Sequence, residues 1–128
     1  MNIDPKPGEV YFVDLGMAKK ARNILVVSVR DAEAPLAVIS GLSLTRHYHQ
    51  SPYEVVLPKL PWMREQSYVN AQSLGGYKFV ELQRLQGKLE SSVMQQVRIP
   101  LYSWLEIWLK ACLSGWLPKA ENVAAASQ

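Results

Sequence analysis

Three cationic side chains lie close together near the start of the chain. Lys19, Lys20 and Arg22 come immediately before an unbroken run of apolar residues. A guanidinium held at the end of a strand, beside two ammonium groups, can bind phosphate oxygens through paired hydrogen bonds. The alternative is that Arg22 forms an ordinary surface ion pair with Asp14 or Asp31.

The segments on either side of these cations predict two paired strands. Pro7–Leu15 alternates in character, as a half-buried strand does, and Ile24–Val27 is a β-favouring apolar run typical of a strand covered on both faces. The connection Met17–Arg22 is too short to hold a crossover helix. We therefore expect antiparallel neighbours, with Arg22 at the start of the second strand.

Two histidines lie in a polar loop, Thr45–Pro52. If this loop is extended, His47 and His49 point the same way, because alternate side chains of an extended chain share a face. Imidazole is the side chain best suited to proton transfer near neutral pH. The other interpretation is two solvent-exposed histidines without a chemical role. A zinc site is not expected, since no third ligand has suitable spacing.

Composition indicates one ordinary folded domain. The chain has 128 residues, 48% apolar and 20% charged, with a net charge of +3, which permits a polyanionic partner without requiring one. We expect a single domain over residues 1–116 and a flexible tail over 117–128. The single cysteine, Cys112, rules out an internal disulfide, and no signal or membrane segment is evident. A soluble, cytoplasmic protein is predicted.

Short strands continue along the middle of the chain. Hydrophobic runs bounded by Pro, Gly and polar residues predict further strands, and Gly75–Gly76 predicts a bend. Beyond that bend, Tyr77–Leu82 could be a strand or an extended connection. The three further predicted strands are Leu36–Ser43, Tyr53–Leu57 and Ser67–Gln72.

The last part of the chain has helical periodicity. Ser91 or Ser92 could cap the helix, Gly115 and Pro118 could end it, and Pro100 should kink or divide it. Apolar residues recur at spacings of three and four. They are Val93, Val97, Leu101, Trp104, Leu105, Trp108 and Cys112.

Five or more short strands followed by one helix predict a mainly β fold. The short connections favour a small, strongly bent antiparallel barrel flanked or plugged by the helix. The amphipathic helix offers more apolar surface than a small barrel can cover, so an interface with a second copy or a partner is expected.

Several segments, taken in order, resemble the MazF/PemK/Kid toxins of type II toxin–antitoxin systems. The similarity begins with Gly8–Leu15 and with Arg22 before Ile-Leu-Val-Val-Ser. It continues through Ala37–Ser43 and Pro52–Leu57, then through Ser-Tyr-Val-Asn at 67–70 and Gly-Lys-Leu at 87–89 before the helix. It covers roughly residues 7–113.

The resemblance implies an SH3-like barrel with a C-terminal helix, usually a homodimer, neutralised by a cognate antitoxin. It implies cleavage of single-stranded RNA at short sequences, without a metal or other cofactor. The family's strand-edge arginine corresponds to Arg22. Its hydroxyl residue at the end of the third strand falls on Ser43, where threonine is usual, with Thr45 as a nearby substitute.

This chain departs from the family pattern at three places. The first loop is shorter than usual and carries lysines instead of a glycine-rich acidic stretch. The proline that normally follows the arginine is Asn23. An aspartate often found after the fifth strand falls on Gln72, which cannot act as a base.

RNA contact is expected from cations, polar side chains and aromatic rings near these motifs. Lys59 and Arg64 could add phosphate contacts, and Tyr48, Tyr53 and Trp62 could stack on bases, although Tyr53 is more typical of a core position. The predicted RNA-binding residues are Lys19, Lys20, Arg46, His47, His49, Asn70 and Gln72.

Two other functions stay open on the sequence. The gyrase poison CcdB shares the toxin fold, has no ribonuclease activity and acts through the end of its C-terminal helix. Gly115–Leu117 occupies a comparable place here. A catalytically inactive binding module of the same fold is the other alternative.

Overall fold

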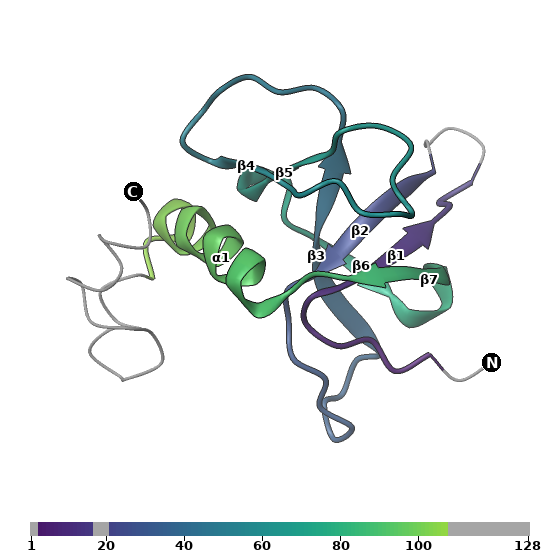
Figure 1. The fold of residues 1–128 in the computed structure, drawn as a ribbon. Coiled ribbons are helices and arrows are strands. Elements are labelled where there is room, and N and C mark those ends of the chain that lie inside the picture. Colours follow the sequence, from purple (N-terminus) through teal and green to yellow (C-terminus); the bar gives the residue numbers. More distant parts are fainter. Residues whose placement is uncertain (1–2, 17–20, 108–128) are drawn as a thin grey trace.

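The computed structural model describes residues 3–16 and 21–107. These residues form seven strands, two short 3-10 helices and one α-helix (Figure 1). The elements are β1 (Glu9–Val13), β2 (Arg22–Val26), β3 (Val38–Thr45), β4 (Glu54–Val56), β5 (Tyr68–Asn70), η1 (Ala71–Ser73), β6 (Gly75–Lys78), η2 (Phe79–Glu81), β7 (Leu82–Lys88) and α1 (Ser91–Leu105).

The strands form one bent antiparallel sheet in the order β4-β5-β3-β2-β1-β7. The predicted pairing of the first two strands is confirmed, with Val10 opposite Leu25 and Val13 opposite Arg22. β2 pairs with β3 on its other side. The far edge of β3 is shared, since β6 pairs with its first half and β5 with its end. The predicted mainly β, barrel-like fold with a C-terminal helix is therefore confirmed.

Both faces of β1 and β2 are buried. One face, with Val10 and Leu25, packs into a core that β4, β5 and α1 complete (Figure 1). The other face, with Val13 and Ile24, forms a second core. The apolar run of the second strand therefore faces two cores in alternation, which explains why it contains no polar residue after Asn23.

The helix is shorter than its apolar periodicity predicted. It begins after Glu90, not at a serine cap, and continues through Pro100 without being divided. It ends at Leu105, because Glu106 adopts a left-handed conformation with a φ of 58°. The Glu106 and Ile107 N–H groups then bond back to the Ser103 and Tyr102 carbonyls at 3.2 Å each, which terminates the helix. Trp108, Cys112, Gly115 and the predicted tail lie outside the described residues.

The bend predicted at Gly75–Gly76 is wrong. Both glycines belong to β6 and pair with Gly41 and Ser40 of β3. Backbone pairing along the far edge of β3 overrides the turn preference of the glycine pair. The predicted fifth strand is also shorter, because a 3-10 turn begins at Ala71. No helix within the described ranges is long and apolar enough to cross a membrane.

Replacing Leu25 with alanine should destabilise the protein strongly. Leu25 is fully buried between Val10 and Leu42, so truncation leaves a cavity and should cost about 2–5 kcal/mol. Chemical denaturation measures this difference. The control is Leu85→Ala on β7, where the side chain is 52% exposed and the expected change is within about 0.5 kcal/mol. Equal effects of the two substitutions would contradict the assigned core.

Candidate functional site

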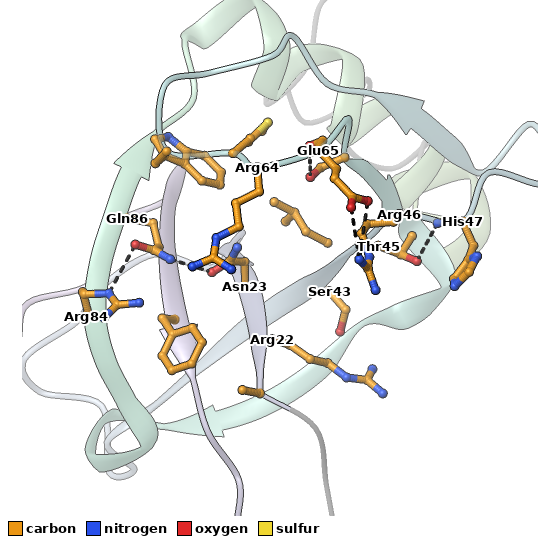
Figure 2. Close-up of a pocket in the computed structure, with 16 residues that line it drawn as sticks. Arg22, Asn23, Ser43, Thr45, Arg46, His47, Arg64, Glu65, Arg84 and Gln86 are labelled. Carbon is orange, nitrogen blue, oxygen red and sulfur yellow. Dashed lines mark hydrogen bonds and ion pairs between the residues drawn. The ribbon is translucent and has the colours of Figure 1, made fainter.

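A cavity of about 830 Å³ opens at the end of the sheet where β2 begins and β3 ends (Figure 2). Strands β1, β2, β3 and β7 all contribute to its lining, and so does the segment 62–65 between β4 and β5. Its lining residues are Phe12, Ala21, Arg22, Asn23, Ser43, Leu44, Thr45, Arg46, His47, Trp62, Met63, Arg64, Glu65, Ser67, Arg84 and Gln86.

Arg22 and Ser43 lie on the same face of neighbouring strands. Ser43 pairs with Ile24, two residues after Arg22, so the two side chains are diagonal cross-strand neighbours. Figure 2 shows both at the lower rim of the cavity. Neither side chain has a hydrogen-bonding partner or ion pair among the described residues, so both are available to a bound molecule. The ion pair of Arg22 with Asp14 or Asp31 does not form.

The backbone of Ser43 is fixed from behind by a turn. Its N–H donates to Ser73 Oγ at 2.9 Å, and the Ser73 hydroxyl donates to the Asn70 carbonyl at 2.6 Å. The Asn70 side chain in turn accepts the Gln72 N–H at 2.9 Å. Asn70 and Gln72, predicted to contact RNA, therefore do not line the cavity. They build the turn that positions Ser43.

Thr45, Arg46 and His47, which follow Ser43 at the end of β3 and just after it, also line the cavity. The Thr45 hydroxyl accepts the His47 N–H at 3.1 Å, which turns the chain sharply after β3. Arg46 forms an ion pair with Glu65, with 3.4 Å between Nη1 and Oε1. Both side chains are largely exposed, so the pair adds little to the stability of the fold. His47 lines the cavity, whereas His49 does not, so the two histidines do not act on the same space.

A polar network that the sequence interpretation missed covers the side formed by β1, β2 and β7. Arg84 Nε donates to Gln86 Oε1 at 3.3 Å, and Gln86 Nε2 donates to Asn23 Oδ1 at 3.1 Å. The Arg84 guanidinium also lies 4.8 Å from the centre of the Phe12 ring. The strand register places Phe12 opposite both Asn23 and Arg84. Only this register, and no sequence motif, brings the four residues together.

Arg64 points into the middle of the cavity (Figure 2). Its guanidinium has no partner within the described part of the chain, and its backbone carbonyl accepts Lys59 Nζ at 3.3 Å. Next to it, Trp62 packs directly on the backbone of Gly87, where a Cβ atom would collide with the indole ring. The glycine of the Gly-Lys-Leu segment therefore makes room for Trp62 in the cavity wall.

The remaining predicted RNA contacts lie elsewhere or cannot be placed. Lys19 and Lys20 lie outside the described residues. Tyr48 stacks on Tyr68, with ring centres 4.6 Å apart, and does not line the cavity. Tyr53 packs against the core and meets Trp104 edge-on, as its expected core position implied.

The loop that carries His47 is anchored by a buried carboxylate. Glu54 accepts the His49 N–H at 3.0 Å and the Ser51 N–H at 3.0 Å. The pKa of Glu54 lies below its usual value, chiefly because the His49 N–H stabilises the charged form. Bonds from Ser51 act in the same direction against the opposing effect of burial.

The cavity is strongly cationic. Four arginines line it against a single carboxylate, Glu65. Two of these arginines, Arg22 and Arg64, keep their guanidinium groups unpaired by any described residue. Such a surface suits a ligand that carries several phosphates. No group of three or more potential metal ligands occurs among the residues that the structure describes.

Comparison with known proteins finds similarity in structure rather than in sequence. No family model and no curated protein sequence matches the chain. An endoribonuclease from a mycobacterial species, solved with its cognate antitoxin, matches with a TM-score of 0.70 and 24% identity, over 80% of this chain and 96% of that one. A second mycobacterial endoribonuclease matches with a TM-score of 0.67 and 25% identity, over 81% and 93%.

A MazF from Deinococcus radiodurans matches with a TM-score of 0.68 and 19% identity, over 82% of this chain and 99% of that chain. The match therefore spans nearly the whole of a protein that bears the MazF name. This chain has the MazF fold. The MazF fold includes the bent sheet and the helix after β7.

Replacing Glu54 with glutamine should destabilise the protein in a pH-dependent way. A carboxyl whose pKa is lower in the folded state stabilises the fold above its ordinary value of 4.5 and loses that contribution as the pH falls. The variant should therefore be less stable than the original protein at pH 7, and the difference should shrink below about pH 4. Denaturation at several pH values measures it. A difference that stays constant from pH 7 to pH 3 would contradict the assigned role.

Proposed function

We propose that this protein is the toxin of a type II toxin–antitoxin pair and cleaves single-stranded RNA at short sequences without a metal ion. The observation that carries the proposal is the unpaired Arg22 guanidinium beside the Ser43 hydroxyl, at the rim of an arginine-lined cavity. The MazF fold supports it, since two solved proteins of similar structure are named endoribonucleases.

The proposed reaction is attack of a ribose 2′-hydroxyl on the adjacent phosphorus. The bond from phosphorus to the 5′-oxygen breaks, giving a 2′,3′-cyclic phosphate and a 5′-hydroxyl. Negative charge grows on the phosphoryl oxygens as the new bond forms. Arg22 would hold two of these oxygens, and its hydrogen bonds would strengthen as the charge develops. The Ser43 hydroxyl would donate to a phosphate oxygen and fix its orientation, with the Thr45 hydroxyl two residues further along β3.

The reaction also needs a proton acceptor for the 2′-hydroxyl and a proton donor for the 5′-oxygen. Gln72 cannot serve, because an amide is not a base and because its position behind Ser43 keeps it out of the cavity. His47 lines the cavity, and its imidazole would accept the 2′-hydroxyl proton near neutral pH, while a water molecule would protonate the departing 5′-oxygen. We assign this role to His47 in place of the family's aspartate.

The proposed partners are single-stranded RNA, a cognate antitoxin and a second copy of the chain. A mycobacterial endoribonuclease of the same fold was solved with its cognate antitoxin, and Deinococcus MazF with MazE. The exposed Trp104 and Leu105 at the end of α1 are apolar surface that an interface could cover. The single domain over residues 1–116 and the cytoplasmic location stay predictions.

Replacing Arg22 with alanine should abolish RNA cleavage and growth arrest while leaving the fold intact. Loss of one such donor costs about 2.7–4 kcal/mol of barrier, or roughly a hundred- to thousandfold in rate. The assay incubates a long RNA with purified protein in EDTA and identifies the new ends. The control is Arg98→Ala on α1, which should cut at the original rate.

Discrete cuts ending in 2′,3′-cyclic phosphate support the proposal, and an unchanged rate for Arg22→Ala contradicts the assigned site. Intact RNA with the original protein contradicts the ribonuclease function itself. In that case, inhibition of a topoisomerase would favour the gyrase-poison alternative, and no effect on either target would favour an inactive binding module.

Replacing His47 with glutamine should lower the cleavage rate by about a hundredfold and remove one limb of its pH profile. Glutamine keeps hydrogen-bonding capacity but cannot exchange a proton near neutral pH. The measurement is the single-turnover rate from pH 5 to pH 9. His49→Gln is the matched control, because His49 lies in the same loop outside the cavity. The same pH profile for both variants and the original protein would rule out proton transfer by His47.

A further inference from the structure

We propose that Asn23, Gln86 and Arg84 form a base-recognition subsite that prefers a keto base, uracil or guanine, over an amino base, cytosine or adenine. This inference rests on the proposed function for its ligand class, single-stranded RNA, and adds the chemistry of the base.

The direction of each hydrogen bond in the network is fixed by Arg84. A guanidinium donates and never accepts, so the Gln86 atom that faces Arg84 Nε at 3.3 Å must be the amide oxygen. The Gln86 amide nitrogen therefore points to Asn23 and donates to Oδ1 at 3.1 Å. The orientation of both amides follows from one charged donor.

Each amide oxygen in this arrangement already accepts one hydrogen bond, whereas several N–H groups have no acceptor among the described residues. The Asn23 and Gln86 amide oxygens both receive a hydrogen bond within the network. The Asn23 amide NH2 group (Nδ2) and the terminal nitrogens of Arg84 have no partner among the described residues. Both residues line the cavity, so its occupant meets a surface of N–H groups on this side. Ligand atoms that face these free N–H groups directly must be acceptors, because a donor at that place would oppose two N–H groups.

The surroundings suit a base with its phosphate. Phe12 and Trp62 supply apolar ring surface to the same cavity, and the Arg84 guanidinium is held 4.8 Å from the Phe12 ring centre. Arg64 points toward Asn23 from the opposite side (Figure 2). Its unpaired guanidinium can hold a phosphate while the base reaches the amide network. Arg22 lies at the start of the same strand, so this base and the reacting phosphate would belong to neighbouring nucleotides.

The four bases differ at one exocyclic position that such a donor surface can distinguish. Uracil O4 and guanine O6 are acceptors, whereas cytosine N4 and adenine N6 are donors. The pyrimidine pair gives the cleanest comparison, because uracil and cytosine have the same shape. A keto oxygen would accept from Asn23 Nδ2, and an amino group at the same place would oppose it.

Asn23→Asp tests the proposal with almost no change in shape. The substitution keeps the oxygen that accepts from Gln86 and replaces the free amide NH2 group with a second acceptor oxygen. Fluorescence anisotropy would measure binding of 2′-O-methyl oligouridine and oligocytidine hexamers, which cannot be cleaved. The original protein should bind oligouridine about tenfold more tightly, and Asn23→Asp should abolish or invert that preference.

Gln72→Glu is the matched control, because it makes the same change from amide to acid at an exposed residue outside the cavity. It should weaken both oligonucleotides equally and keep the preference for uridine. Asn23→Ala removes the donor without adding charge and should also lose the preference, which covers the case in which the aspartate variant does not fold.

Equal affinity of the original protein for the two oligonucleotides would overturn the proposal, and so would a preference unchanged by both Asn23 variants. These outcomes are independent of cleavage, because the probes cannot react. A protein that binds uridine preferentially but cuts no RNA would contradict the proposed function and leave the subsite supported.

Discussion

The burial of β2 on both faces is the constraint on which the site depends. Leu25 packs into one core and Ile24 into the other, and the strand pairs with β1 and β3 along both edges. The register of β2 therefore cannot slip by one residue without exchanging its two faces. Arg22 and Asn23, the two residues that precede this buried segment, are held at the rim as a result.

Because successive side chains of a strand point to opposite faces, the fixed register of β2 also decides which residues reach each side of the cavity. Arg22 shares a face with Ile24 and is a diagonal neighbour of Ser43 on β3. Asn23 shares a face with Leu25 and lies opposite Phe12 of the neighbouring strand β1. One strand thus presents a phosphate-binding cation to one side of the cavity and an amide to the other. The unpaired arginines cost stability in the free protein, because like charges repel, and a polyanionic ligand would relieve that repulsion.

The sequence predicted the framework better than the walls of the cavity. Apolar alternation and the short first connection were enough to pair β1 with β2 and to place Arg22 correctly. They could not reveal that Asn23, Arg84 and Gln86 meet, because β1 and β7 are far apart in the chain and their register has irregularities. The expected roles of Asn70 and Gln72 overlooked the turn that these residues build behind Ser43. The helix end was missed because Glu106, not a glycine, takes the left-handed position.

The most direct test of the central claim is the side-chain NMR signal of each arginine during titration with a non-cleavable 2′-O-methyl RNA hexamer. If the cavity binds the RNA backbone at the start of β2, the Nε–H signals of Arg22 and Arg64 should shift together and saturate with the same affinity. Arg98 on α1 should stay unchanged. Shifts confined to arginines outside the cavity, or no shift at Arg22, would contradict the account.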